Sequence, residues 1–170
     1  MTQEIAHRQQ FAVSIETYWR ELCLNLDYQE RLYCEALGCA RMEIVELTGD
    51  YEKGMKRRLR FTKPIDAPAA ITKLFGTHVT IEEHSEFDAR EQCWSYRMVP
   101  SMMADRVDIR GRVHIVQGDG TIEQRSLNTV SCKMFGLGSI IEHFVAKSTE
   151  QGNADKAAFT RRYIEEKKLR

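Results

Sequence analysis

The stretch Arg106–Lys133, RVDIRGRVHIVQGDGTIEQRSLNTVSCK, carries the clearest structural signal in this sequence. It consists of two extended runs, Arg106–Gln117 and Thr121–Lys133, on either side of Gly118-Asp119-Gly120. Glycine and aspartate favour the backbone angles of a tight turn between two strands. The stretch therefore predicts two antiparallel strands joined by a short hairpin connection.

The chain before this hairpin has the same period of two residues. Four side chains at alternate positions share one face of the strand predicted over Gly54–Lys63; they are Met55, Arg57, Leu59 and Phe61. Pro68–Phe75 is predicted to form a short helical or turn-like excursion. The remaining predicted strands are Ala40–Leu47, which a turn at Gly49-Asp50 joins to Gly54–Lys63, then Thr77–Phe87 and Gln92–Val99.

Two short helices are predicted near the N-terminus. An extended segment over Glu4–Val13 leads to Ser14, a good helix N-cap, with Trp19 and other apolar residues at helical spacing behind it. A second helix is predicted to open at Asp27 and to stop at Gly38.

The longest helical pattern follows Gly136-Leu137-Gly138 and continues towards the C-terminus. Charged residues occupy one side of this predicted helix, and Gly152-Asn153 is a predicted kink or interruption in it. The apolar side consists of Leu137, Ile141, Phe144, Val145, Ser148, Phe159 and Tyr163.

The predicted order is strand, two short helices, six strands and a long helix. Helices that are separate in sequence from a meandering antiparallel sheet are typical of the α+β class. No stretch has the composition of a linker, so we expect residues 1–170 to form a single domain.

Composition excludes several classes of function. The 25 basic and 25 acidic residues cancel, so no overall basic field favours nucleic acid, and we expect no nucleic-acid partner. No apolar run approaches the roughly 18 residues of a membrane span, and the N-terminus lacks the zones of a secretory signal. We therefore expect a cytoplasmic protein.

The histidines and cysteines do not form a recognisable metal or catalytic motif. The five histidines lie on different predicted elements, and the five cysteines include no Cys-x-x-Cys pair. We expect unpaired thiols that act as small apolar residues, no metal site, no cofactor and no assignable catalytic residue. His143 is the histidine of most interest, because it lies near the start of the long helix.

Two stretches carry a resemblance to a known superfamily. They are Phe11–Trp19, FAVSIETYW, at the first helix and Gly138–Val145, GSIIEHFV, at the last. START-like (SRPBCC, helix-grip) proteins commonly begin with a strand, a small residue and a Trp-containing helix. They commonly end with a glycine before an amphipathic helix that contains an Ile-Glu pair. Over essentially its whole length the chain resembles an uncharacterised bacterial branch of that superfamily.

The resemblance implies a helix-grip fold, a curved seven-stranded antiparallel sheet wrapped around the long C-terminal helix. It also implies an internal cavity for sterols, phospholipids, polyketides or other apolar molecules, although the same side chains would equally suit a filled core. The candidate ligand-binding residues on the concave face and the helix are Met55, Arg57, Leu59, Phe61, Ile81, Glu83, Trp94, Tyr96, Met98, Ile141, Phe144 and Val145.

Two of these candidates are charged. Arg57 shares a predicted face with Leu59, and Glu83 shares one with Ile81, so both are expected to point inward. A buried charge is costly unless it is paired, which favours either an Arg57–Glu83 contact or a contact between Arg57 and an anionic ligand head. A bulge that turns both side chains to solvent is the alternative.

A loop between two predicted strands contains Met102 and Met103. Adjacent methionines suit adaptable apolar contacts. By the resemblance to START-like lipid carriers, they are candidates for a lid over the cavity that makes transient membrane contact. Alternatively, they pack back onto the core.

Three functions remain open from the sequence. The leading hypothesis is non-enzymatic binding, with transport as its extension, of a lipid or other hydrophobic small molecule in the cavity. The second is a cyclase, hydratase or lyase that moves protons through Arg57, Glu83, Tyr96 or His143. The third is a ligand-free interaction module, comparable to chaperone-activating relatives, which predicts a filled core. The sequence does not determine the oligomeric state.

Overall fold

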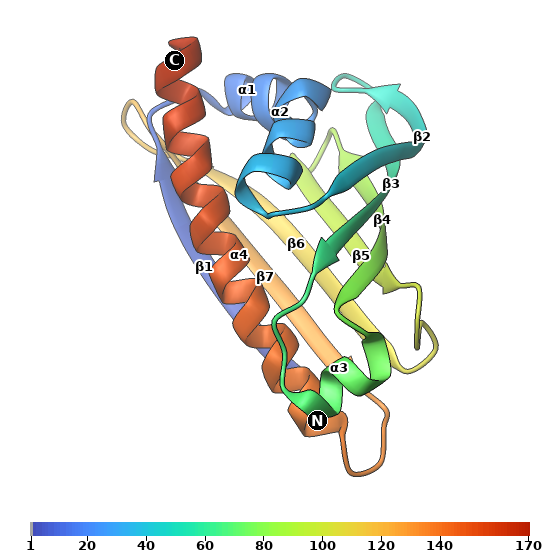
Figure 1. Ribbon diagram of the computed structural model, residues 1–170. Helices are drawn as coiled ribbons and strands as arrows, with labels where there is room; N and C mark the ends of the chain where they lie inside the picture. The colour runs from blue at the N-terminus through green and yellow to red at the C-terminus, as the bar shows by residue number, and fades with distance from the viewer. Residues whose placement is uncertain (1) are drawn as a thin grey trace.

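A curved antiparallel sheet of seven strands forms the frame of the protein (Figure 1). A computed structural model describes residues 2–170, apart from the side chains of residues 74 and 75. The strands are β1 (Thr2–Phe11), β2 (Arg41–Asp50), β3 (Gly54–Pro64), β4 (His78–Asp88), β5 (Cys93–Pro100), β6 (Val107–Gln117) and β7 (Ile122–Cys132). Their order across the sheet is β1-β7-β6-β5-β4-β3-β2, and every neighbouring pair is antiparallel.

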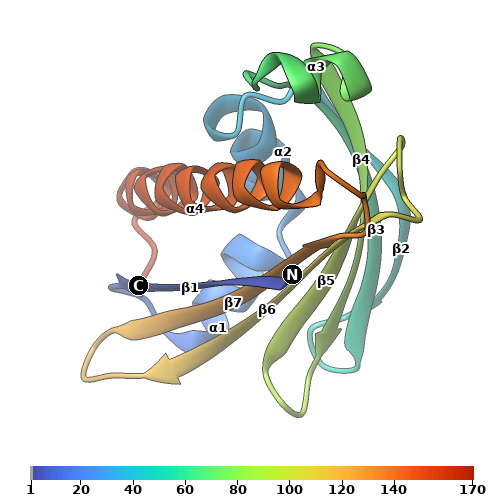
Figure 2. The same ribbon diagram turned by 90° about the horizontal axis from the view of Figure 1, so that it is seen from below.

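The helices lie on the concave side of this sheet, and Figure 2 shows the longest one, α4, lying within the curve. They are α1 (Ile15–Thr17), η1 (Tyr18–Cys23), α2 (Leu26–Arg31), η2 (Leu32–Ala36), α3 (Ala69–Phe75) and α4 (Gly138–Lys167), of which η1 and η2 are π-helical turns. The predicted α+β helix-grip fold, with two short helical segments after the first strand, is therefore confirmed. None of the helices among the described residues is long and apolar enough to cross a membrane.

The ends of the elements follow local hydrogen bonding. Ser14 is the N-cap of α1, as predicted, and its Oγ accepts a hydrogen bond of 3.0 Å from the Thr17 amide. The second helix begins earlier than the predicted Asp27, because Asn25 caps it by accepting a hydrogen bond from the Tyr28 amide. The predicted turn at Gly49-Asp50 is also too early, since β2 continues to Asp50 and the turn follows it.

A close contact fixes the point where α4 leaves the sheet. Glu142 is 1% exposed, and its Oε1 accepts a hydrogen bond of 2.8 Å from the backbone amide of Cys132, the last residue of β7. Gly138 lies so close that an added Cβ would be 2.9 Å from the Cys132 carbonyl oxygen. The glycine and the glutamate of the stretch GSIIEHFV therefore hold the helix against the end of β7.

Helix α4 then continues without interruption for 30 residues. Of the two alternatives predicted at Gly152-Asn153, the interruption is wrong, because the helix includes both residues. Buried residues on either side of this position, among them Ala146, Ala157 and Phe159, anchor the helix, and such tertiary packing outweighs the weak local cost of glycine in a helix.

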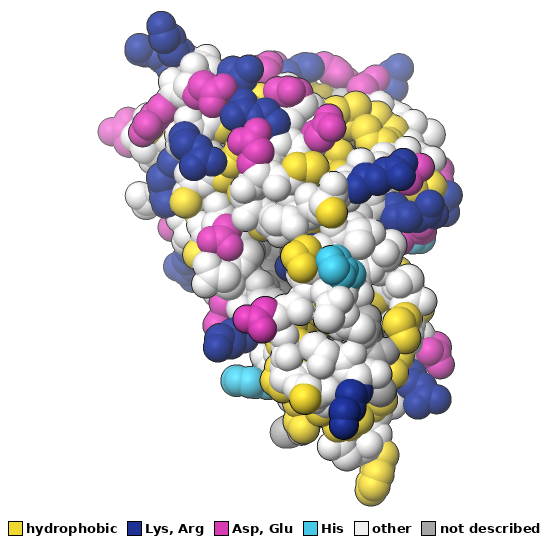
Figure 3. Space-filling view, in the orientation of Figure 1, with side chains coloured by type: hydrophobic (Ala, Val, Ile, Leu, Met, Phe, Trp, Pro, Cys, Tyr) yellow, Lys and Arg dark blue, Asp and Glu magenta, His cyan; other side chains and the backbone are white. Residues whose placement is uncertain are grey.

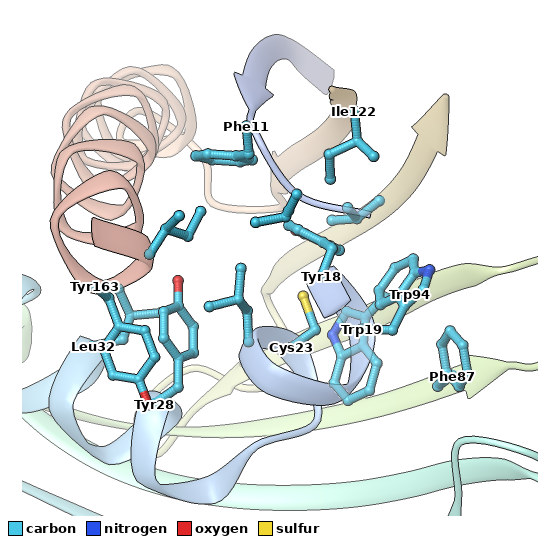
Figure 4. Packing of buried hydrophobic residues seen from close by; sticks show 14 of the residues in the cluster. Phe11, Tyr18, Trp19, Cys23, Tyr28, Leu32, Phe87, Trp94, Ile122 and Tyr163 are labelled. Carbon is cyan, nitrogen blue, oxygen red and sulfur yellow. The ribbon is translucent and has the colours of Figure 1, made fainter. Parts of the chain in front are cut away.

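The largest apolar cluster fills one end of the space between α4 and the sheet (Figure 4). Trp19 is fully buried, and its ring centroid lies 4.8 Å from that of Phe87 on β4. On the other side of the cluster, Tyr28 and Tyr163 meet edge to face at 5.0 Å. This aromatic packing joins the short helices to the C-terminal half of α4.

The convex face of the sheet carries cross-strand ion pairs. Arg60 and Arg58 on β3 pair with Glu82 on β4 at 3.0 and 3.7 Å, and Lys56 pairs with Glu86 at 3.9 Å. Opposite charges on neighbouring strands thus satisfy one another, and each exposed pair stabilises the fold by less than about 1 kcal/mol.

Candidate functional site

A cavity of about 270 Å³ lies between the concave face of the sheet and α4, beyond the aromatic cluster. The face shown in Figure 3 is hollowed near its centre, in the region where Figure 1 shows α4 facing the end of β3. The candidate residues that line the cavity are Arg57, Phe61, Ile81, Glu83, Trp94, Tyr96, Met98, Ile141, Phe144 and Val145.

Four other candidates do not line this cavity. Met55 points inward but packs in the aromatic cluster, and Leu59 is fully buried against Phe61 and its neighbours. Met102 is 47% exposed, whereas Met103 packs against the cluster that contains Val107. The lid role of the two methionines therefore stays a prediction.

Arg57 and Glu83 form a buried ion pair in the cavity wall. Arg57 Nη2 lies 3.0 Å from Glu83 Oε1, and the two side chains are only 3% and 4% exposed. The pairing of β3 with β4 is regular along its length, so no bulge turns either side chain outward. The expected inward orientation and the expected pairing are both confirmed.

Further contacts complete this network. Tyr33 donates a hydrogen bond of 2.6 Å to Glu83 Oε2, and Arg57 Nη1 donates one of 3.3 Å to the Cys23 carbonyl oxygen. The guanidinium also lies 4.5 Å from the centre of the Trp94 ring. Glu83 therefore matches the charge of Arg57, and the Arg57 Nε atom is buried with no hydrogen-bond partner among the described residues.

The network sets the protonation of its members. Burial alone would raise the pKa of Glu83, but the Arg57 charge and the Tyr33 hydrogen bond outweigh it and hold that pKa below its usual value. Burial and the neighbouring carboxylate raise the pKa of Tyr33 well above its usual value, and burial likewise raises the pKa of Tyr96. At neutral pH the carboxylate is therefore ionised and both phenols are protonated.

A second polar region lies on β7 and was not predicted. Gln124, Ser126 and Asn128 are less than 8% exposed, and all three line the cavity. The Tyr96 hydroxyl donates a hydrogen bond to Asn128 Oδ1 across Gly111, where an added Cβ would lie 2.1 Å from the tyrosine Cζ. The Asn128 Nδ2 atom has no hydrogen-bond partner among the described residues.

Five further residues of α4 form the opposite wall, and of these only Ser148 was predicted on the inward side of the helix. Ser148, Thr149, Gly152, Asn153 and Lys156 all line the cavity. Lys63 lines the cavity as well. It lies two residues after Phe61 on β3, so the alternation of this strand could have predicted that it points inward.

None of the histidines among the described residues lines this cavity, whereas Cys23 and Cys39 are part of its wall. His143 is exposed and does not line the cavity, in contrast to its proposed role in proton transfer. Cys23, Cys39, Cys93 and Cys132 are buried free thiols as predicted, whereas Cys34 is exposed. The described residues contain no group of three His, Cys, Asp or Glu side chains that could hold a metal ion.

Comparison with known families gives one match, and it covers most of the chain. The model described as "Protein of unknown function (DUF2505)" matches residues 6–164. A comparison with curated protein sequences found no match.

Solved structures of the same fold cover nearly the whole chain at low sequence identity. The Zhui aromatase/cyclase from Streptomyces sp. R1128 is 14% identical, with 96% of each chain covered and a TM-score of 0.65. A norcoclaurine synthase point mutant from Thalictrum flavum is 19% identical over 99% of this chain and 97% of its own, with a TM-score of 0.65. A START superfamily protein from Mycobacterium smegmatis is 12% identical over 91% and 94%, with a TM-score of 0.58. These likenesses confirm the START-like helix-grip fold.

Proposed function

Because the chain belongs to the family described as "Protein of unknown function (DUF2505)" and has the START-like fold, we propose from its own cavity that it binds a hydrophobic small molecule. The ligand lies between the concave face of the sheet and α4. The whole chain serves as a single binding domain, and transport of the ligand is an extension of this binding.

The cavity itself carries this proposal. Its wall is mostly apolar, with Trp94, Met98 and Ile141 among its side chains, while a few polar groups converge on it from β3, β7 and α4. This composition is that of small-molecule sites in general. Each Å² of apolar ligand surface removed from water would contribute about 25 cal/mol before ordering costs are subtracted.

The size of the cavity restricts the ligand. A volume of about 270 Å³ is at the lower end of the roughly 300–1,000 Å³ that small-molecule pockets occupy. It favours a ligand with one short chain or a few rings over a lipid with two long acyl chains.

Protonation states favour binding over acid–base catalysis. Proton transfer is most efficient when the pKa of the catalytic group is near the working pH. In this cavity the pKa of Glu83 is lowered, and the pKa values of Tyr33 and Tyr96 are raised. These three groups are therefore poorly matched to proton transfer at neutral pH, and His143 lies outside the cavity lining.

The open cavity also distinguishes ligand binding from the interaction module. A ligand-free module predicted a filled core, whereas a cavity of about 270 Å³ remains between the packed clusters of this core. A cavity of this size leaves its lining without packing partners, which a bound ligand would restore.

The test is uptake of N-phenyl-1-naphthylamine, a neutral apolar dye that fluoresces in apolar surroundings, together with native mass spectrometry of the purified protein. Ser148→Phe places a large ring in the cavity and is expected to abolish uptake. Glu150→Phe, an exposed position on the same helix, is the matched control and is expected to leave uptake unchanged. Equal uptake by both variants, or none by the unaltered protein, would contradict the proposal.

A further inference from the structure

The charged residues of the cavity do not balance. Arg57, Lys63 and Lys156 line it as cations, and Glu83 is the one acidic side chain in its lining among the described residues. Glu83 is already paired with Arg57 at 3.0 Å. Two positive charges at the cavity therefore have no acidic counterpart in its wall.

Lys156 is directed towards the buried side of α4. It is partly buried, and its charge lowers the pKa of Cys23, although burial of that thiol has the larger, opposite effect. It also contributes to the lowered pKa of His7 on β1, after burial and Arg161. The lining of the cavity includes Lys156, so this side chain faces the space between α4 and the sheet.

An unpaired hydrogen-bond donor lies next to Lys156. Asn153 precedes it by three residues on α4, so the two Cβ atoms are about 5–6 Å apart on the same face of the helix. The Asn153 Nδ2 atom is buried and has no partner among the described residues, and the same holds for Asn128 Nδ2 on β7. A buried donor without an acceptor is costly, so these amides favour a ligand with acceptor oxygens.

Resting on the proposed function, we propose that the ligand is an apolar monocarboxylic acid whose carboxylate lies against Lys156 and Asn153. The ammonium and the amide offer one donor to each carboxylate oxygen, and a charge-assisted hydrogen bond is the stronger kind. Unlike Lys156, Lys63 has no neighbouring amide among the buried donors that lack a partner. One cation is enough to balance the charge of a carboxylate, so Lys63 is not needed for this contact. The apolar part of the ligand then extends towards Trp94 and Met98.

The experiment is displacement of N-phenyl-1-naphthylamine by decanoic acid and by decan-1-ol, which differ only in the head group. At about neutral pH the acid is expected to bind about tenfold more tightly than the alcohol, the effect of one charge-assisted hydrogen bond. Lys156→Met is expected to remove this preference by weakening acid binding about tenfold, and to change alcohol binding by less than about twofold. Asn153→Leu is expected to reduce the preference in the same direction.

Two control variants locate the effect. Lys147→Met removes an exposed lysine of α4 outside the cavity lining and is expected to leave both affinities unchanged. Lys63→Met is expected to retain most of the preference for the acid. Three results would overturn the inference and leave the proposed function standing. They are equal displacement of the dye by acid and alcohol, an equal loss of affinity for both in Lys156→Met, and loss of the preference for the acid only in Lys63→Met. If the dye does not bind to the unaltered protein, both this inference and the proposed function are contradicted.

Discussion

Replacement of Glu83 by glutamine is the most direct test of the buried network. The change keeps the side-chain volume and an acceptor for Tyr33, but removes the negative charge that lies 3.0 Å from Arg57 Nη2. Loss of one partner leaves the other charge buried and uncompensated, which typically costs about 3–5 kcal/mol. The free energy of unfolding is therefore expected to fall substantially.

The remaining contacts of Arg57 place the loss at the lower end of this range. Its Nη1 still donates to the Cys23 carbonyl oxygen at 3.3 Å, and its Cζ stays 4.5 Å from the centre of the Trp94 ring. A desolvated cation–π contact is worth about 2 kcal/mol. We expect a loss of about 3 kcal/mol. The Arg57→Met/Glu83→Gln double variant is expected to recover most of it, because neither charge is then buried.

Urea unfolding at about neutral pH, followed by tryptophan fluorescence, measures both values. Two results would contradict this prediction. One is a loss of unfolding free energy below about 1 kcal/mol in Glu83→Gln, and the other is a loss in the double variant as large as the sum of the losses in the two single variants. The pH dependence gives a second readout. The pKa of Glu83 is lowered from 4.5 in the folded state, so its stabilisation is present above pH 4.5 and is lost as the pH falls below it. The variant is expected to lose less stability over this acid range.

Three glycines give further predictions, each checked by urea or thermal unfolding. Gly111→Ala is expected to lose about 1–3 kcal/mol, because its Cβ would lie 2.1 Å from Tyr96 Cζ and 2.6 Å from Asn128 Oδ1. The same change in a Tyr96→Ala background should cost less, because only the contact with Asn128 then remains. Gly152→Ala is expected to gain about 0.5–1 kcal/mol, because the nearest atom to the added Cβ is 3.9 Å away and glycine is unfavourable within a helix. Gly138→Ala on the same helix should instead destabilise, because its Cβ would lie 2.9 Å from the Cys132 carbonyl oxygen; a gain there would contradict that close contact.

The sequence predicted the elements of this fold well because their signals are local. The strand predicted over Gly54–Lys63 is β3 with one residue added, and Ser14 caps the first helix as its side chain suggests. Alternation also placed Arg57 and Glu83 on the inner face, and the cost of burying an unpaired charge then favoured their contact. The failures were at turns and caps, where Asn25 acts in place of the neighbouring Asp27.

The cavity wall was predicted where one side of a strand or of α4 is apolar and the other is polar. On β7 both faces are polar, with Glu123 and Arg125 outside and Gln124 inside, so periodicity gave no reason to choose the inner set. Apart from Ser148, the polar residues of α4 were not predicted, for a different reason. Gly152-Asn153 has the local signature of a helix end, but the helix continues through it between buried residues on either side, and Asn153 lines the cavity.

The order of the elements, their period and the inward face of β3 to β5 could therefore be predicted from local patterns in the chain. The tertiary structure decided which inward side chains meet one another and which are left around empty space. Met55 and Tyr96 have the same alternation, yet the first packs among aromatic rings and the second lines the cavity. The physical reason is that periodicity is set by the backbone of one strand, whereas a cavity depends on how far the curved sheet and α4 are held apart by residues distant in sequence.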